Sequence, residues 1–144
     1  MSQESPETGF IPVGTRVEFA KTVSESDIYL FAGITGDFSP NHVNAEYMKT
    51  TPYGTIVAHG VLIVGLMSTC STKVLEHTLT RRPAVSYGYD RIRFVQPVRV
   101  GDTVTVSYEI TGVDAEAAKT TANITAVNQD GQVVAVATHI LKFL

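Results

Sequence analysis

Apolar and polar residues alternate in four segments of the second half of the chain, with turn-forming residues between them. This alternation predicts half-buried β-strands, because successive side chains of a strand point to opposite faces of a sheet. The four expected strands cover residues 84–95, 103–113, 119–128 and 133–143. Asp130-Gly131 favours a hairpin turn between the last two. The pattern therefore predicts an antiparallel sheet of consecutive strands.

A weaker alternation at residues 15–23 predicts a first strand, after which apolar residues recur at helical spacing. Ser24 can cap the helix, with Asp27 in its first turn, and Gly36 should end it. The helix therefore delivers the chain directly into the residues that follow Gly36.

The stretch after this helix contains Pro40 and several residues typical of turns. Because proline and turn-forming residues restrict the backbone, local propensity argues against a helix in residues 36–44. Asn44 can then cap a short helix over residues 44–49. We expect a loop followed by one short helix.

The longest apolar segment, residues 61–76, is apolar on nearly all faces in its first two turns. It is too long for one buried strand, so it predicts a buried central helix. Polar residues gather near its end, which predicts an interior amino-terminal half and a carboxy-terminal half that reaches solvent. Its apolar window, residues 61–67, is far shorter than the roughly 20 residues that cross a bilayer, so we expect no membrane contact.

These elements form an α+β pattern in which an antiparallel sheet wraps around one long helix. A chain of 144 residues has the usual size of one domain, so we expect a single domain over residues 1–144, with residues 1–12 flexible. One helix covers only one face of such a sheet, and the strands supply few charges for an exposed edge. We therefore expect a homodimer or larger homo-oligomer with edge strands paired between subunits.

The net charge of −3 and the absence of a Lys/Arg cluster longer than Arg81-Arg82 exclude an obvious electrostatic attraction to nucleic acid. Cys70 is the only cysteine, so no internal disulfide can form. The first ten residues are polar and acidic, unlike a secretory signal. A cytoplasmic location is the expectation.

Asp37 and His42 lie five residues apart around Pro40. A carboxylate and a neutral imidazole that point at one water molecule can orient and deprotonate it near neutral pH. Ser39 lies between them, but no Gly-x-Ser-x-Gly elbow is present, so a hydrolase triad is not expected. A metal site from Asp37, His42 and His59 fits no standard ligand spacing, and we expect none.

Three sequence blocks, in the same order, carry a likeness to a known family. They are FAGITGDFSPNH at residues 31–42, IVAHG at 56–60 and RFVQPVRVGDT at 93–103. The chain resembles the MaoC-like, R-specific enoyl-CoA hydratases over residues 15–144. The resemblance implies a hot-dog fold and reversible syn addition of water to a trans-2-enoyl thioester, giving the (3R)-hydroxyacyl product. It implies no cofactor, since coenzyme A or an acyl carrier thioester is part of the substrate.

By this resemblance, Asp37 and His42 match the catalytic pair. Gly60 matches the position whose backbone N–H binds the thioester carbonyl, where a helix amino terminus stabilises developing negative charge. Further substrate-binding candidates are Ser39, Asn41 and His59, although an imidazole that opens a buried helix is more often structural. The family usually has Asn at the position of Ser39 and an aliphatic residue at that of Asn41. The hypothesis from Asn41 is a substrate with an extra polar group or altered loop packing.

Two alternative functions stay open at this point. The chain could be a 3-hydroxyacyl-[acyl carrier protein] dehydratase, or a non-catalytic acyl-CoA-binding or regulatory protein of the same fold. Retention of both Asp37 and His42 argues against the second alternative. Several cations could meet the phosphates of coenzyme A: Lys73, Arg81, Arg82, Arg91 and Arg93.

Overall fold

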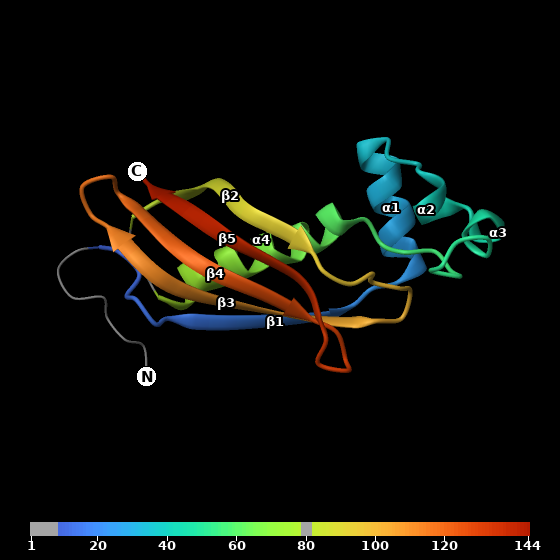
Figure 1. The fold of residues 1–144 in the computed structure, drawn as a ribbon. Coiled ribbons are helices and arrows are strands. Elements are labelled where there is room, and N and C mark those ends of the chain that lie inside the picture. Colours follow the sequence, from blue (N-terminus) through green and yellow to red (C-terminus); the bar gives the residue numbers. More distant parts are fainter. Residues whose placement is uncertain (1–8, 79–81) are drawn as a thin grey trace.

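The computed structural model describes residues 9–78 and 82–144 and has one sheet packed along a long helix (Figure 1). The elements in chain order are β1 (Arg16–Thr22), α1 (Glu25–Thr35), α2 (Pro40–Val43), α3 (Ala45–Met48), α4 (Gly60–His77), β2 (Ala84–Phe94), β3 (Thr103–Asp114), β4 (Lys119–Val127) and β5 (Val133–Phe143). Within the described residues, an antiparallel five-stranded sheet has the order β1-β3-β4-β5-β2. The hot-dog arrangement expected from the sequence is confirmed.

The expected strands agree with the observed ones to within one residue at each end. The strands β3, β4 and β5 pair in succession, while β1 and β2 form the two edges of the sheet. Gly131 has a φ of 74° at the turn between β4 and β5, and its N–H donates to the Asn128 carbonyl at 3.0 Å. Glycine adopts this left-handed conformation without strain, so Asp130-Gly131 closes the turn as predicted.

The start and end of α1 follow the sequence signals. Ser24 and Asp27 form a capping box, in which each side chain accepts a hydrogen bond from the backbone N–H of the other residue. At the other end Gly36 has a φ of 82°. Its N–H donates to the Ala32 carbonyl at 2.8 Å, which ends the helix.

The short helix α2 corrects the expectation that residues 36–44 contain no helix. Pro40 is its first residue, where the missing N–H would have had no partner and the fixed φ suits the helix. The Asn44 N–H donates to the Pro40 carbonyl at 3.0 Å and closes the turn. Asn44 then caps α3 by accepting from the Tyr47 N–H at 3.0 Å, as expected.

The long helix α4 lies lengthwise along the sheet (Figure 1). The buried face runs from Ile63 to Val74, while Val61 at the amino-terminal end is 58% exposed. The expected division into a buried first half and a solvent-exposed second half is therefore wrong, because one face is buried along the whole length. None of the helices in the described ranges has the length and apolar content that a membrane crossing requires.

The amino-terminal segment contributes to the core from Phe10 onward. Phe10 and Ile11 are buried, and the Phe10 ring packs edge-on against Phe143 with 5.2 Å between centroids. Both residues fall in the segment 1–12 that was expected to be flexible, and they are part of the packed structure instead. Residues 1–8 lie outside the described ranges.

A polar cluster lies inside the sheet on the side of α4. His139 on β5 is fully buried, with Nδ1 2.8 Å from the Tyr108 hydroxyl and Nε2 2.7 Å from the Ser86 hydroxyl. The Tyr89 ring stacks on His139 at 4.3 Å between centroids. Burial lowers the pKa of His139 to about 4. The imidazole is therefore neutral at pH 7, with one ring nitrogen donating and the other accepting.

Candidate active site

The turn after α1 sets the position of Asp37. The Asp37 N–H donates to the Thr35 hydroxyl at 3.2 Å, and one carboxylate oxygen accepts from the Ser39 N–H at 3.3 Å. These local bonds form because short polar side chains readily bond to nearby backbone groups in turns. Ser39 thus supports the Asp37 carboxylate through its main chain.

His42 is held by the one-turn helix α2 and by a more distant backbone group. The main-chain N–H of His42 donates to the Ser39 carbonyl at 2.9 Å. The ring nitrogen Nδ1 lies 2.7 Å from the Val57 carbonyl oxygen. A carbonyl oxygen can only accept, so Nδ1 carries the proton of this hydrogen bond. In the neutral ring Nε2 is then unprotonated and available to accept a proton.

His59 lies just before α4 and is 2% exposed. Its Nε2 lies 3.0 Å from the main-chain carbonyl oxygen of Asp37. The His59 ring stacks on the His42 ring, with 3.6 Å between centroids and 25° between planes. The Phe31 ring also contacts the His59 ring, with 4.7 Å between centroids. The imidazole is therefore packed beneath the loop that carries Asp37 and His42.

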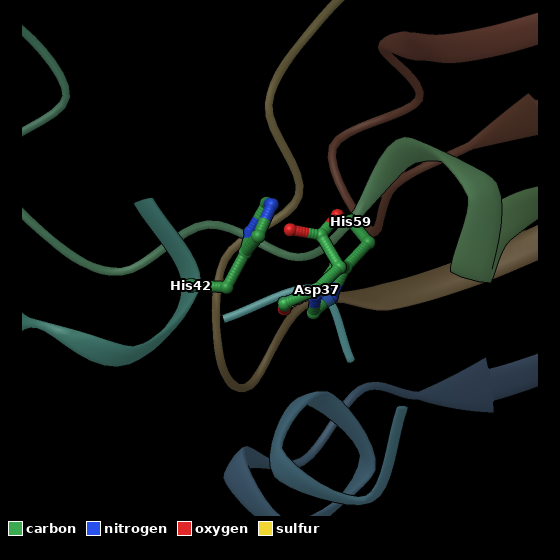
Figure 2. Close-up of side chains that lie close together, drawn as sticks. All are labelled: Asp37, His42 and His59. Carbon is green, nitrogen blue, oxygen red and sulfur yellow. Dashed lines mark hydrogen bonds between the residues drawn. The ribbon is translucent and has the colours of Figure 1, made fainter. Parts of the chain in front are cut away.

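The side chains of Asp37, His42 and His59 gather in one place (Figure 2), with one polar atom of each within 4.8 Å of the others. Asp37 is exposed and His42 is half-buried, so the pair is open to solvent. Each hydrogen bond to a water molecule spans about 2.8 Å. A carboxylate oxygen and a ring nitrogen at this separation can therefore contact the same water.

The same three side chains were weighed from the sequence as metal ligands. The lone pair of an imidazole nitrogen lies in the ring plane, and a zinc ion binds it at about 2.0–2.1 Å. The rings of His42 and His59 are stacked, with 3.6 Å between centroids and 25° between planes. A single ion cannot lie in both planes at bonding distance, so the geometry does not suit a shared metal ion.

A cavity of about 220 Å³ lies next to this cluster, at the amino-terminal end of α4. It is lined by both polar and apolar residues, namely Asn41, Tyr53, Val57, Ala58, Gly60, Ile63, Phe94, Val95, Gln96, Pro97, Val98 and Val134. The Val57 N–H donates to the Asn41 carbonyl at 3.0 Å. Because the Val57 carbonyl accepts from His42, Val57 connects the cavity wall to the cluster.

Gly60 is the first residue of α4, so its N–H has no acceptor within the helix. The Phe94 ring lies on its Cα, and a Cβ at this position would come within 2.7 Å of three ring atoms. A larger residue would require the Phe94 ring or the start of α4 to move. Phe94 and Gln96 belong to the third sequence block but were not singled out as site residues, and Tyr53 was not singled out either.

The candidate phosphate-binding cations do not share one location. Lys73 is 13 residues from Gly60 on α4, about 20 Å along the axis at 1.5 Å per residue. The Arg82 guanidinium lies over the Phe10 ring at 4.7 Å. Arg91 and Arg93 are exposed on β2, the strand that ends at Phe94. Arg81 lies outside the described residues.

The chain is similar in sequence to proteins named as thioester hydratases and dehydratases. The chain is 42% identical to an (R)-specific enoyl-CoA hydratase of Rhodospirillum rubrum over 106 residues, 74% of this chain and 70% of that protein. It is 36% identical to a 3-hydroxybutyryl-CoA dehydratase of Methylorubrum extorquens over 100 residues, 69% of this chain and 60% of that protein.

The structure superposes on an (R)-hydratase from A. caviae involved in PHA biosynthesis with a TM-score of 0.80 and 25% identity, covering 92% of this chain and 97% of that one. The MaoC like domain matches residues 10–132. This match contains the Asp37 loop, the start of α4 and the strand that ends at Phe94. The chain therefore belongs to the MaoC-like domain family.

Proposed function

We propose that this protein is a hydro-lyase that adds water reversibly to a trans-2-enoyl-CoA thioester to give the (3R)-3-hydroxyacyl-CoA. The observation that carries the proposal is the placement of the Asp37 carboxylate and the His42 ring within reach of one water molecule. Relatives named as an (R)-specific enoyl-CoA hydratase and a 3-hydroxybutyryl-CoA dehydratase support this reaction class. The dehydratase name describes the same chemistry in reverse.

In the proposed mechanism, a water molecule donates hydrogen bonds to Asp37 and to Nε2 of His42. As the water oxygen bonds to C3, one of the pair removes its proton and the C2=C3 π electrons move toward the thioester carbonyl. The resulting enolate collapses as the same proton is returned to C2. Because both additions come from one water position, they occur on one face of the double bond. Syn addition follows.

Gly60 is proposed to stabilise the enolate. Negative charge grows on the thioester oxygen as water adds, so a donor aimed at that oxygen lowers the barrier. The Gly60 N–H is unpaired within α4, and the positive end of the helix dipole lies at the same place. A thioester carbonyl at Gly60 would bring the double bond toward Asp37 and His42.

The cavity beside Gly60 is proposed to receive the acyl group. Its apolar wall suits a hydrocarbon chain, while Asn41, Tyr53 and Gln96 add polar groups to the lining. This supports the hypothesis from Asn41 of a substrate with an additional polar group. Preference for a plain crotonyl or hexenoyl thioester over every hydroxylated or carboxylated analogue would contradict it.

The decisive experiment follows the loss of the enoyl absorbance of crotonyl-CoA in the presence of the protein. We expect turnover in both directions, with the 3R product identified by chiral analysis. Parallel assays with the same acyl group on an acyl carrier protein separate a CoA hydratase from a carrier-protein dehydratase. If neither thioester is turned over although both bind, the non-catalytic alternative is correct.

Gly60→Ala keeps the backbone N–H but adds a Cβ that crowds it, so we expect kcat/KM for crotonyl-CoA to fall by about 10- to 100-fold as the donor becomes less well placed. The added Cβ would clash with the Phe94 ring, so the ring or the start of α4 would have to shift. Phe94→Ala in the same chain removes the clash. If the double variant regains wild-type activity, the Gly60 position matters through the steric contact alone.

Self-association through β2 is proposed for the oligomer. The two edge strands of the sheet differ in chemistry. β1 carries the ion pair of Arg16 with Glu18 at 2.8 Å, whereas the first half of β2 exposes Val85 and Tyr87, and its exposed charges, Arg91 and Arg93 among them, lie in the second half. Charges discourage edge-to-edge pairing, and an apolar edge favours it. We therefore propose a homodimer formed by β2 strands of two subunits.

Sedimentation velocity checks this proposal. The wild-type protein is expected to sediment with twice the mass of the 144-residue chain. Val85→Lys combined with Tyr87→Lys should convert it to the monomer, because like charges would face each other across the shared edge. Val113→Lys, at an exposed position near the end of β3, is the matched control and should leave the mass unchanged. A wild-type monomer at micromolar concentration would contradict the proposal.

A further inference from the structure

We propose that His59 is a positioning residue for the Asp37–His42 pair and does not itself contact the substrate. This inference rests on the proposed function, since it concerns the same site. Three observations carry it: the bond of His59 to the Asp37 main chain, its stacking on His42, and the state of its second ring nitrogen.

The first observation concerns Asp37. The Nε2–H of His59 donates to the Asp37 carbonyl at 3.0 Å, a contact between residues 22 positions apart. The local bonds of Asp37 come only from its own turn, to Thr35 and Ser39. The bond from His59 connects this exposed turn to the buried start of α4. Without it, the carboxylate would be held by the turn alone.

The second observation concerns His42. The rings of His42 and His59 stack at 3.6 Å, while Val57 fixes the edge of the His42 ring through Nδ1. A hydrogen bond at one edge still permits the ring to tilt. A flat surface beneath the ring removes that freedom. Val57 and His59 together therefore fix the direction in which Nε2 of His42 points.

The third observation is that the second ring nitrogen of His59 lowers the stability of the fold. Nδ1 of His59 is buried and has no hydrogen-bond partner among the described residues. A buried nitrogen without a partner destabilises the fold, and His59 makes no side-chain bond to cap α4. A phenylalanine would keep a flat ring without this unpaired nitrogen. The imidazole is therefore explained by its bond to Asp37, not by stability.

Three variants separate the two contacts. His59→Phe keeps the stacking surface and removes the donor, His59→Gln keeps an amide donor and removes the ring, and His59→Ala removes both. We expect kcat for crotonyl-CoA hydration to fall about 10- to 100-fold in His59→Ala, because small displacements of reacting groups have effects of this size. KM should stay within about threefold, since substrate binding is not affected.

The kcat values of His59→Phe and His59→Gln should lie between those of His59→Ala and wild type. The melting temperature of His59→Phe should be at or above the wild-type value. A purely structural role predicts the opposite: a lower melting temperature for His59→Phe, with kcat per folded molecule unchanged. His139→Asn removes a buried imidazole away from the site. It serves as the control and should reduce stability while leaving kcat unchanged.

A mutant cycle tests whether His59 acts through Asp37. In an Asp37→Asn background, His59→Ala is expected to reduce the residual rate by less than about twofold, because residues that act as a unit are not additive. An equal reduction in both backgrounds would overturn the proposal.

NMR of the histidine ring nitrogens reports the tautomers of His42 and His59 without requiring turnover. Wild type should contain His42 as the Nδ1–H tautomer and His59 as the Nε2–H tautomer. In His59→Ala the His42 nitrogen signals should shift, because the ring can tilt and its Nδ1–H bond to the Val57 carbonyl is then less well aligned. If wild type is inactive but these signals move, positioning stands and the hydratase proposal fails. If wild type is active and His59→Ala changes neither kcat nor the His42 signals, positioning fails and the hydratase proposal stands.

Discussion

Asp37→Asn is expected to lower kcat/KM for hydration of crotonyl-CoA by about 10² to 10⁴-fold, and His42→Ala by a similar factor. The asparagine fills the same space but cannot accept a proton, and alanine removes Nε2 as a base. The double variant should be little slower than either single variant, because the two side chains are proposed to act on one water molecule. Initial rates from the loss of the enoyl absorbance measure all three.

The controls for these variants remove the same chemical groups elsewhere. His77→Ala deletes an exposed imidazole at the end of α4, and Asp114→Asn neutralises an exposed carboxylate at the end of β3. Both should retain wild-type kcat/KM. Unchanged activity in Asp37→Asn and His42→Ala would remove the proposed acid–base mechanism, whatever the fold.

The free energy of unfolding is expected to fall by about 3 kcal/mol through His139 as the pH drops from 6.5 to 4. Burial lowers the pKa of this imidazole from its usual 6.5 to about 4 in the folded protein. Between these values the unfolded chain binds a proton at His139 and the folded chain does not, so acid favours unfolding. Above pH 6.5 both states are neutral and the effect is absent. Below pH 4 both are protonated and the loss is complete.

Urea unfolding at several pH values measures how steeply the free energy of unfolding depends on pH. His139→Asn leaves a polar side chain near the Tyr108 hydroxyl but cannot titrate in this range, so its stability should depend less steeply on pH than that of wild type. Its stability at pH 7 should also be lower, since the Ser86 and Tyr108 hydroxyls lose a well-placed partner. His77→Asn, at an exposed site, should keep the wild-type slope. An unchanged slope in His139→Asn would contradict the assigned burial effect.

The strands and the long helices could be predicted because their signals are local. Alternation over residues 103–113 gave β3 almost to the residue, and Ser24 with Asp27 marked the start of α1. The one-turn helix α2 was missed for a positional reason. Proline disrupts a helix interior but suits the first position, and the sequence alone did not reveal which position Pro40 takes.

The candidate site was predictable only in part. Asp37 and His42 are five residues apart, so their proximity follows from a short turn. The bond from His42 to Val57 and the contact of Phe94 with Gly60 link segments far apart in the chain, and periodicity carries no information about them. For the same reason, the burial of His139 beside Tyr108 could not be inferred from the alternation of β5.

The helix α4 both packs against the sheet through its buried face and begins at Gly60, with His59 as the residue before it. Buried residues such as Met67 and Val74 therefore hold in place the same helix that presents the proposed oxyanion donor. Substitutions in the core around α4 that alter thermal stability would therefore also move the start of the helix at Gly60. If the proposed site is correct, core substitutions along α4 should change stability and turnover together, whereas substitutions at strand ends or connecting turns should change stability with less effect on turnover.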